Sequence, residues 1–216
     1  MLQKTGLFVI AVVIANSLTG CASKRTEVSL FMPSSPITNQ IETNKTVAIR
    51  SISDSRTFEN NSPNPSIESL GVGMISPGED VQEIQTRAIA RVSNGNNEAM
   101  GNVVLQKGQT VESLVRDSIF SVLQQSGYRV VPMSNASKTT LILDVSIRKF
   151  WAWDSFGMMA KRVHAAIDTT ITRSDKTQPL TTHIHTTVTK FTGGHDEAIQ
   201  QALSDYRSRL GSDLEH

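Results

Sequence analysis

Three segments in the second half of the chain alternate strictly between apolar and polar side chains. They are TTLILDVSIRKF (139–150), RVHAAIDTTITR (162–173) and PLTTHIHTTVTK (179–190). A period of two with one polar face is typical of strands in an antiparallel sheet that is covered on one side. The short SDKT loop pairs Ile167 with Ile184 and Asp168 with His183, so apolar meets apolar and polar meets polar. We therefore predict an antiparallel three-strand unit with a fixed register.

Two amphipathic helices are expected to cover the apolar side of this sheet. The first spans about 111–126, with Thr110 as its N-cap and Gly127 as its stop. The second spans 196–210, with acidic residues in its first turn and basic residues in its last. An earlier segment, 83–92, has apolar residues every four positions and fits either a strand or a short helix. The predicted class is α+β, an antiparallel-rich mixed sheet with two amphipathic helices on one face.

The first residues have the layout of a bacterial secretory signal. Lys4 is the only charge before an apolar run at 7–15, which is too short to span a bilayer as a mature helix. The Leu-Thr-Gly stretch before Cys21 resembles a lipobox. This resemblance implies that residues 1–20 are removed and that Cys21 is acylated, which gives a stable membrane anchor. The alternative is an ordinary cleaved signal in which Cys21 is incidental.

This interpretation divides the chain into a signal peptide (1–20), a lipidated cysteine with a tether (21–45) and a single periplasmic α/β domain (46–211). Ala22 stands where inner-membrane lipoproteins of enteric bacteria carry a retention aspartate, so we expect the periplasmic face of the outer membrane. The 21 basic residues nearly balance the 20 acidic ones, which argues against nucleic-acid binding. Cys21 is the only cysteine, so no intrachain disulfide can form.

The order of these segments resembles the YajG-type family of bacterial lipoproteins. The likeness rests on the lipobox, the strand that ends in SISDSRTFE, the helix and strand TVESLVRDSIFSVLQQSGYRVV, and the three-strand unit with its C-terminal helix. It spans nearly the whole mature chain. The resemblance implies a lipid-anchored envelope protein, and the family offers no known catalytic residues to carry over.

The sequence favours a protein that is not an enzyme. No serine lies in a Gly-x-Ser-x-Gly elbow, and no glycine loop of the phosphate-binding type is present. The strongest chemical grouping is the polar face of the three-strand unit, where His183 and His185 project together, with Asp168 opposite His183 and His164 one strand over. Two imidazoles on one face can bind zinc. A solvated threonine-rich face needs no ligand, however, so we predict no catalytic residues, no metal site and no cofactor.

The segment FWAWDSFGMM (150–159) holds both tryptophans of the chain and is expected to form the tip of a hairpin. Pairing Val163 with Ile147 ends the strand before this segment. Trp151 shares its parity with Ile147, so we expect it to be packed. Either the whole tip folds back over a helix end, or part of it serves a partner protein or a bilayer surface. In the second case, the exposed apolar patch consists of Trp153, Phe156, Met158 and Met159.

The expected function is that of a non-enzymatic outer-membrane lipoprotein, attached to the membrane by its lipid, which acts as a periplasmic scaffold or regulator by binding another envelope protein. The first alternative is a periplasmic ligand-binding module for a lipid or a peptidoglycan fragment, and the second is an envelope hydrolase. A deep apolar pocket would favour the ligand-binding module. An exposed aromatic hairpin on a domain without such a pocket would favour the scaffold.

Overall fold

The computed structural model describes residues 25–31, 45–71, 75–158 and 160–215. The helices are α1 (Val81–Arg87), α2 (Val111–Gln125), α3 (His195–Glu215) and the short 3-10 helix η1 (Met133–Asn135). The strands are β1 (Arg25–Val28), β2 (Thr46–Asp54), β3 (Glu59–Asn60), β4 (Ser69–Leu70), β5 (Ala88–Ser93), β6 (Ala99–Leu105), β7 (Arg129–Val130), β8 (Leu141–Phe156), β9 (Lys161–Arg173) and β10 (Leu180–Lys190).

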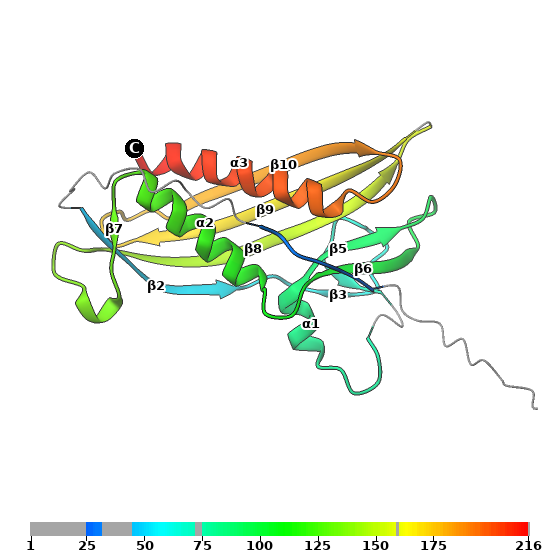
Figure 1. The fold of residues 1–216 in the computed structure, drawn as a ribbon, viewed down its shortest axis with the longest axis horizontal. Coiled ribbons are helices and arrows are strands. Elements are labelled where there is room, and N and C mark those ends of the chain that lie inside the picture. Colours follow the sequence, from blue (N-terminus) through cyan, green and yellow to red (C-terminus); the bar gives the residue numbers. More distant parts are fainter. Residues whose placement is uncertain (1–24, 32–44, 72–74, 159, 216) are drawn as a thin grey trace, which may run out of the picture.

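A long central strand, β8, organises the main sheet (Figure 1). One edge of β8 pairs antiparallel with β9, which in turn pairs antiparallel with β10. Two strands that run parallel to β8 share its other edge: β2 lies along the first half and β5 along the second half. The sheet continues from β2 to β7, and from β5 to β6 and β1. The mixed sheet confirms the predicted fold class.

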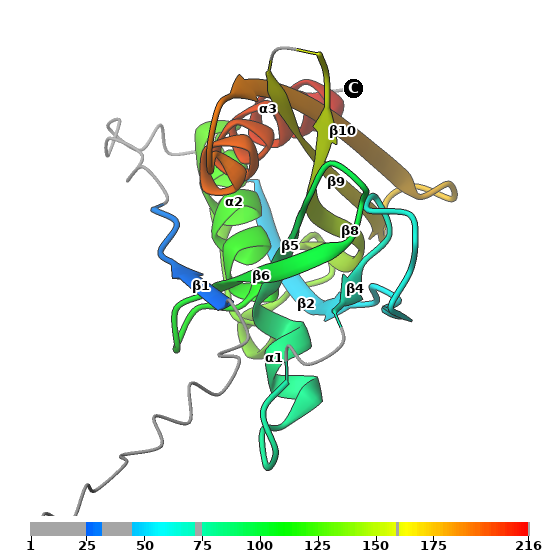
Figure 2. The same cartoon turned by 90° about the vertical axis from the view of Figure 1, so that its right-hand side faces the viewer.

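Helices α2 and α3 lie side by side on one face of the sheet (Figures 1 and 2). The start of α2 is fixed by a capping box, in which Thr110 Oγ1 accepts from the Ser113 amide at 3.1 Å and Ser113 Oγ accepts from the Thr110 amide at 3.0 Å. The apolar stripes of both helices bury the central side chains of β8 and β9 in one main core. The two amphipathic helices therefore cover one face, as predicted.

Helix α3 is longer than the sequence predicts. We expected it to end at Leu210, before Gly211, but it continues to Glu215. A Cβ atom on Gly211 would lie 3.9 Å from Val122 Cγ1 of α2, so the two helices are in contact at this point. Leu214 in the added turn is buried in the main core. Packing of this last turn outweighs the general preference of glycine for the position after a helix.

The predicted register of the last hairpin is confirmed. Ile184 lies opposite Ile167, and His183 lies opposite Asp168. A slip of one residue would move the apolar side chains of this pair to the exposed face, so the alternation fixes the register. The loop length and the alternation together were sufficient to predict this pairing.

The predicted register of the preceding hairpin is wrong. Val163 lies opposite Asp154 instead of Ile147. The difference has two causes: β8 continues to Phe156, and its pairing with β9 shifts at a bulge between Ile147 and Lys149. The aromatic segment is therefore mainly strand, and the turn that joins β8 to β9 comes after it.

The bulge also reverses the alternation along β8. Ile147, Phe150 and Ala152 face the main core under the helices. Trp151 is fully buried, as predicted, but it points to the opposite face, where it joins a second apolar cluster. The buried members of this cluster are Trp151, Ile84, Ala88 and Val104. The sheet is thus covered on both faces along the second half of β8, which corrects the expectation of one covered side.

A buried arginine ties this second cluster to the sheet. The Arg56 side chain has no exposed surface and forms a bidentate pair with Asp54 at 2.8 Å for both contacts. Its remaining N–H groups donate to the carbonyl oxygens of Gln85 and Ala88 at 2.7 Å and of Phe150 at 3.2 Å. Because every contact is charge-assisted, Arg56 holds the end of β2, the junction of α1 with β5, and β8 in one place.

Candidate functional site

The hairpin between β8 and β9 carries large apolar side chains into solvent. Phe156, the last residue of β8, is 43% exposed, and Met158 in the turn is fully exposed. Figure 1 shows the hairpin at one end of the sheet, beyond the first turn of α3. Both residues belong to the predicted patch. Met159 and Cys21 lie outside the described residues.

A second exposed aromatic residue, Phe191, lies at the same end, and the sequence analysis did not identify it. Phe156 pairs with Lys161 of β9, which pairs with Lys190 of β10, and Phe191 follows Lys190 directly. Phe191 is 85% exposed. We call this part of the molecule the hairpin end, and its exposed apolar residues are Phe156, Met158 and Phe191.

A glycine turn fixes the chain after Phe191. Gly193 and Gly194 both have positive φ angles, of 60° and 89°. A Cβ atom on Gly194 would lie 2.8 Å from Cγ of Lys190, so a larger residue would displace that side chain. The Gly194 carbonyl then accepts a hydrogen bond from the Ala198 amide at 2.9 Å, which starts α3. The tight turn leaves Phe191 outside the core.

A buried charged cluster supports the base of the hairpin end. Asp154 has no exposed surface, and its Oδ1 lies 3.1 Å from Lys161 Nζ and 2.9 Å from His195 Nε2. Its Oδ2 accepts a hydrogen bond from the Ser93 amide at 3.0 Å. One carboxylate thus joins β8 with β5, β9 and the first residue of α3. The sequence analysis did not single out this cluster.

The electrostatics of Asp154 favour its ionised form. Burial alone would raise its pKa, but the close contact with His195, the Ser93 amide and Lys161 together lower the pKa below its ordinary value. Removal of one partner from a buried ion pair usually destabilises a protein. Loss of Lys161 or His195 would remove a partner of this buried carboxylate, so the cluster keeps the hairpin and α3 in a fixed arrangement.

Trp153 lies on the face of the sheet that is opposite to α2 and α3, within a stack of rings. Its indole is nearly parallel to the rings of His164 and His185, with centroids 5.3 and 5.5 Å away. Lys149 Nζ lies 5.6 Å from the Trp153 ring centroid. Trp153 pairs with His164 on β9 and with Arg91 on β5, so it lies within the paired part of β8. It is half-buried and is not part of the exposed patch, which corrects our expectation.

The most enzyme-like arrangement in the described residues adjoins this stack. The Ser155 hydroxyl lies 2.7 Å from His164 Nε2, and His164 Nδ1 lies 3.0 Å from the Thr187 hydroxyl. A serine beside a histidine can be a nucleophile and its base, but the histidine is then usually oriented by a carboxylate. Here a hydroxyl takes that place. Burial, followed by the charges of His185 and Arg162, lowers the pKa of His164.

The remaining predicted polar residues form a solvated face. His183 Nδ1 lies 3.1 Å from Asp168 Oδ1, and the His183 side chain is 70% exposed. His185 instead stacks on His164, with ring centroids 5.4 Å apart. Within the described ranges, no group of three His, Cys, Asp or Glu side chains is arranged to hold a metal ion. No helix among these residues combines the length and apolar character needed to cross a membrane.

Comparisons with known proteins find distant likenesses in structure alone. No family model and no curated protein matches the chain. One similar solved structure is an uncharacterised protein with 8% identity and a TM-score of 0.44, over 89% of this chain and 99% of that chain. Another is protein XCC0632 from Xanthomonas campestris, of the DUF330 family, with 14% identity and a TM-score of 0.45, over 86% and 89%. A third is a proposed neuraminyllactose-binding hemagglutinin homologue from Helicobacter pylori, with 12% identity and a TM-score of 0.34, over 87% and 90%. At these values the likenesses carry no argument about function.

Proposed function

We propose that this chain is a non-enzymatic lipoprotein of the outer membrane whose periplasmic domain binds another envelope protein through the hairpin end. The single observation that carries this proposal is the gathering of Phe156, Met158 and Phe191 in solvent at one end of the sheet. Large apolar side chains that cluster on a protein surface mark interaction sites. The anchor at Cys21 rests on the lipobox-like sequence before it.

The hairpin end is held by paired strands and by a buried carboxylate, and this favours a role in binding. Phe156 lies in a continuous row with Lys161 and Lys190, so three paired strands hold it. The Asp154 carboxylate fixes the strands directly below. A rigid apolar element loses little conformational freedom on binding, and more of its burial then contributes to affinity.

The ligand-binding alternative has less support. A small-molecule site usually encloses most of its ligand in a concave, largely apolar cavity. The hollows found in the described part of the chain are open to solvent: one of about 590 Å³ lies between β2 and α2, and one of about 280 Å³ lies between α2 and α3. An exposed hairpin on a domain whose described hollows are open to solvent favours the scaffold over the ligand-binding module.

Photo-crosslinking in living cells tests the proposal. A photoreactive amino acid is placed at Phe156 or at Phe191, and the crosslinked envelope proteins are identified by mass spectrometry. We expect one and the same partner from both positions. The matched control is Met133 in η1, which is 41% exposed and lies at the β7 end of the molecule. This position should not capture that partner.

A double substitution sharpens the test. In a chain with Phe156→Ser and Phe191→Ser, we expect the partner to be lost from a third crosslinking position at Met158, while circular dichroism of the purified domain stays unchanged. Different proteins at Phe156 and Phe191, or equal capture at Met133, would contradict the proposal.

A further inference from the structure

In the described part of the chain, one edge of β2 has no paired strand over most of its length. Strand β7 pairs with β2 at Thr46 and Val47, where the Val131 amide still donates to the Val47 carbonyl at 2.9 Å. Pro132 follows, and it leads the chain away into η1. Among the described residues, no strand lies along this edge from Ile49 to the end of β2.

The backbone phase shows which groups face the open edge. The carbonyl oxygens of Lys45 and Val47 accept hydrogen bonds from β7. Because the backbone groups of every second residue in a strand point to the same edge, those of Ile49 also point to this edge. The pairing with β8 shifts at a bulge after Ile49. Beyond it, the Ser55 amide donates toward β8, to the Ile147 carbonyl at 2.9 Å. In a strand, the backbone groups of neighbouring residues point to opposite edges. Because those of Ser55 point to β8, those of Asp54, and of Ile52 two residues before it, face the open edge.

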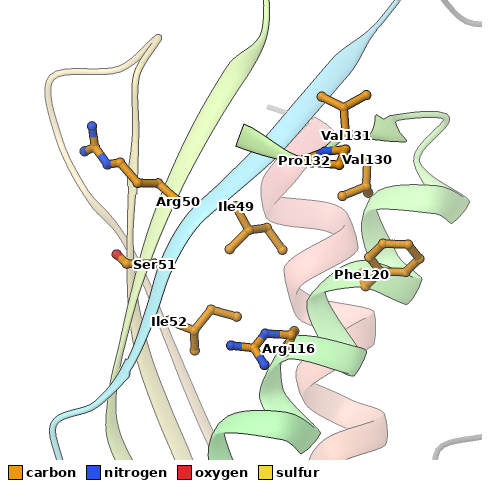
Figure 3. A pocket seen from close by; sticks show the side chains of 9 residues that line it. All are labelled: Ile49, Arg50, Ser51, Ile52, Arg116, Phe120, Val130, Val131 and Pro132. Atoms are coloured by element: carbon orange, nitrogen blue, oxygen red, sulfur yellow. The ribbon is translucent and has the colours of Figure 1, made fainter. Parts of the chain in front are cut away.

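A groove runs between this edge and helix α2 (Figure 3). Its volume is about 590 Å³. In Figure 3 the side chains of Ile49 and Ile52 point from β2 toward α2, across from Phe120, and Val130 lies near one end. Ile49 and Ile52 are half-buried, and Phe120 is 39% exposed. We call this hollow the β2 groove. It combines unpaired strand backbone with apolar side chains, as sites for an added strand do.

The charged side chains of the β2 groove are both cationic. Figure 3 shows Arg116 on α2 near Ile52, whereas Arg50 points from β2 to the side away from α2. Of the two side chains, 62% of Arg50 and 51% of Arg116 is exposed, and none of the described residues that line the groove is acidic. Each arginine contacts one surface carboxylate outside the lining, Asp144 for Arg50 and Glu112 for Arg116. The exposed pair of Arg116 contributes little to stability, whereas Arg50 holds Asp144 through two contacts and still has most of its side chain in solvent. Charge complementarity therefore favours an occupant with carboxylates.

We propose that the β2 groove binds an extended peptide segment of a partner protein, with alternating apolar and acidic residues, by adding it as a strand to β2. The peptide backbone pairs with Ile49, Ile52 and Asp54, its apolar side chains pack toward Phe120, and its carboxylates, which point to the other side of the added strand, meet Arg50. A second copy of this chain is a poor occupant. Pairing two β2 edges around their centres brings the two Arg50 side chains together, and like charges at paired positions are destabilising.

A defined peptide probe tests this proposal with the full chain. The probe is a fluorescent ten-residue peptide of alternating valine and glutamate, and its counterpart has lysine in place of glutamate. Fluorescence anisotropy should show at least about tenfold tighter binding of the glutamate peptide, since like charges at a contact cost affinity. Arg50→Glu should weaken binding of the glutamate peptide and strengthen binding of the lysine peptide.

Hydrogen exchange locates the peptide. On addition of the glutamate peptide, the amides of Ile49, Ile52 and Asp54 should exchange more slowly, and N-methylation of alternate peptide residues should abolish both protection and binding. Phe156→Asp at the hairpin end should leave peptide affinity unchanged, so failure here is separable from failure of the proposed function. Absence of binding, binding without protection of these amides, or protection that arises from self-association without peptide would each overturn the proposal.

Discussion

Replacement of Trp151 by alanine should destabilise the domain strongly, for three reasons that add. Its side chain is fully buried in the second apolar cluster. Its ring forms an edge-to-face pair with Phe58, with centroids 6.0 Å apart and an interplanar angle of 87°. Its Nε1 donates to the Pro65 carbonyl at 3.1 Å. Large-to-small changes of buried tryptophan cost about 3–5 kcal/mol, of which the aromatic pair and the hydrogen bond supply about 1 kcal/mol each.

A graded series of variants separates these contributions. Trp151→Phe keeps an aromatic ring but loses the N–H donor to Pro65, so we expect a loss of about 1–2 kcal/mol. Trp153→Ala removes a half-buried ring from a stack and should cost about 1 kcal/mol. Phe156→Ala, at a 43% exposed position, should stay within about 0.5 kcal/mol. Urea unfolding followed by circular dichroism gives each free energy of unfolding by linear extrapolation. Equal losses for Trp151→Ala and Trp153→Ala would refute the assignment of the two rings to different environments.

Three further outcomes are expected. Cys21→Ser should block lipidation and release the protein from the outer membrane, and persistent labelling of this variant with a radioactive fatty acid would contradict the anchor. Zinc at low micromolar concentration should leave the melting temperature unchanged, whereas a rise that His183→Ala abolishes would establish a metal site on that face. Because the pKa of His164 is lowered in the folded state, the unfolded chain binds this proton more readily. The free energy of unfolding should therefore fall as the pH drops below about 6.5, and His164→Gln should reduce this dependence, as urea titrations at several pH values can measure.

Alternation and capping signals predicted those parts of the fold whose determinants are local. The register of β9 with β10 followed from a four-residue loop and from matched apolar and polar positions. Thr110 was identified as the N-cap of α2, and its capping box is present. The ambiguous segment 83–92 contains both of the expected elements: helix α1 ends at Arg87, and strand β5 begins at the next residue. A helix period and a strand period that follow one another average to an unclear pattern.

The predictions failed where distant parts of the chain decide the outcome. The bulge between Ile147 and Lys149 was not foreseen, and it reversed the expected facing of Trp151. Phe191 was missed because its exposure depends on where β10 ends and on the turn at Gly193. The partners of Asp154 could not be predicted, because two of them, Ser93 and His195, lie far from it in the chain.

The succession of apolar residues Phe150, Trp151 and Ala152 offers a signal that period-two reasoning passes over. A strand with one covered face alternates, whereas a strand buried on both faces carries consecutive apolar residues. All three residues are buried, with Phe150 and Ala152 in the main core and Trp151 in the second cluster. Burial on both faces stiffens β8 just before it emerges at Phe156. Residues 150–153, which include both tryptophans, are therefore not part of the proposed contact surface. They anchor the strand that holds the exposed residues of the hairpin end in place, so a partner that binds there meets a preorganised element.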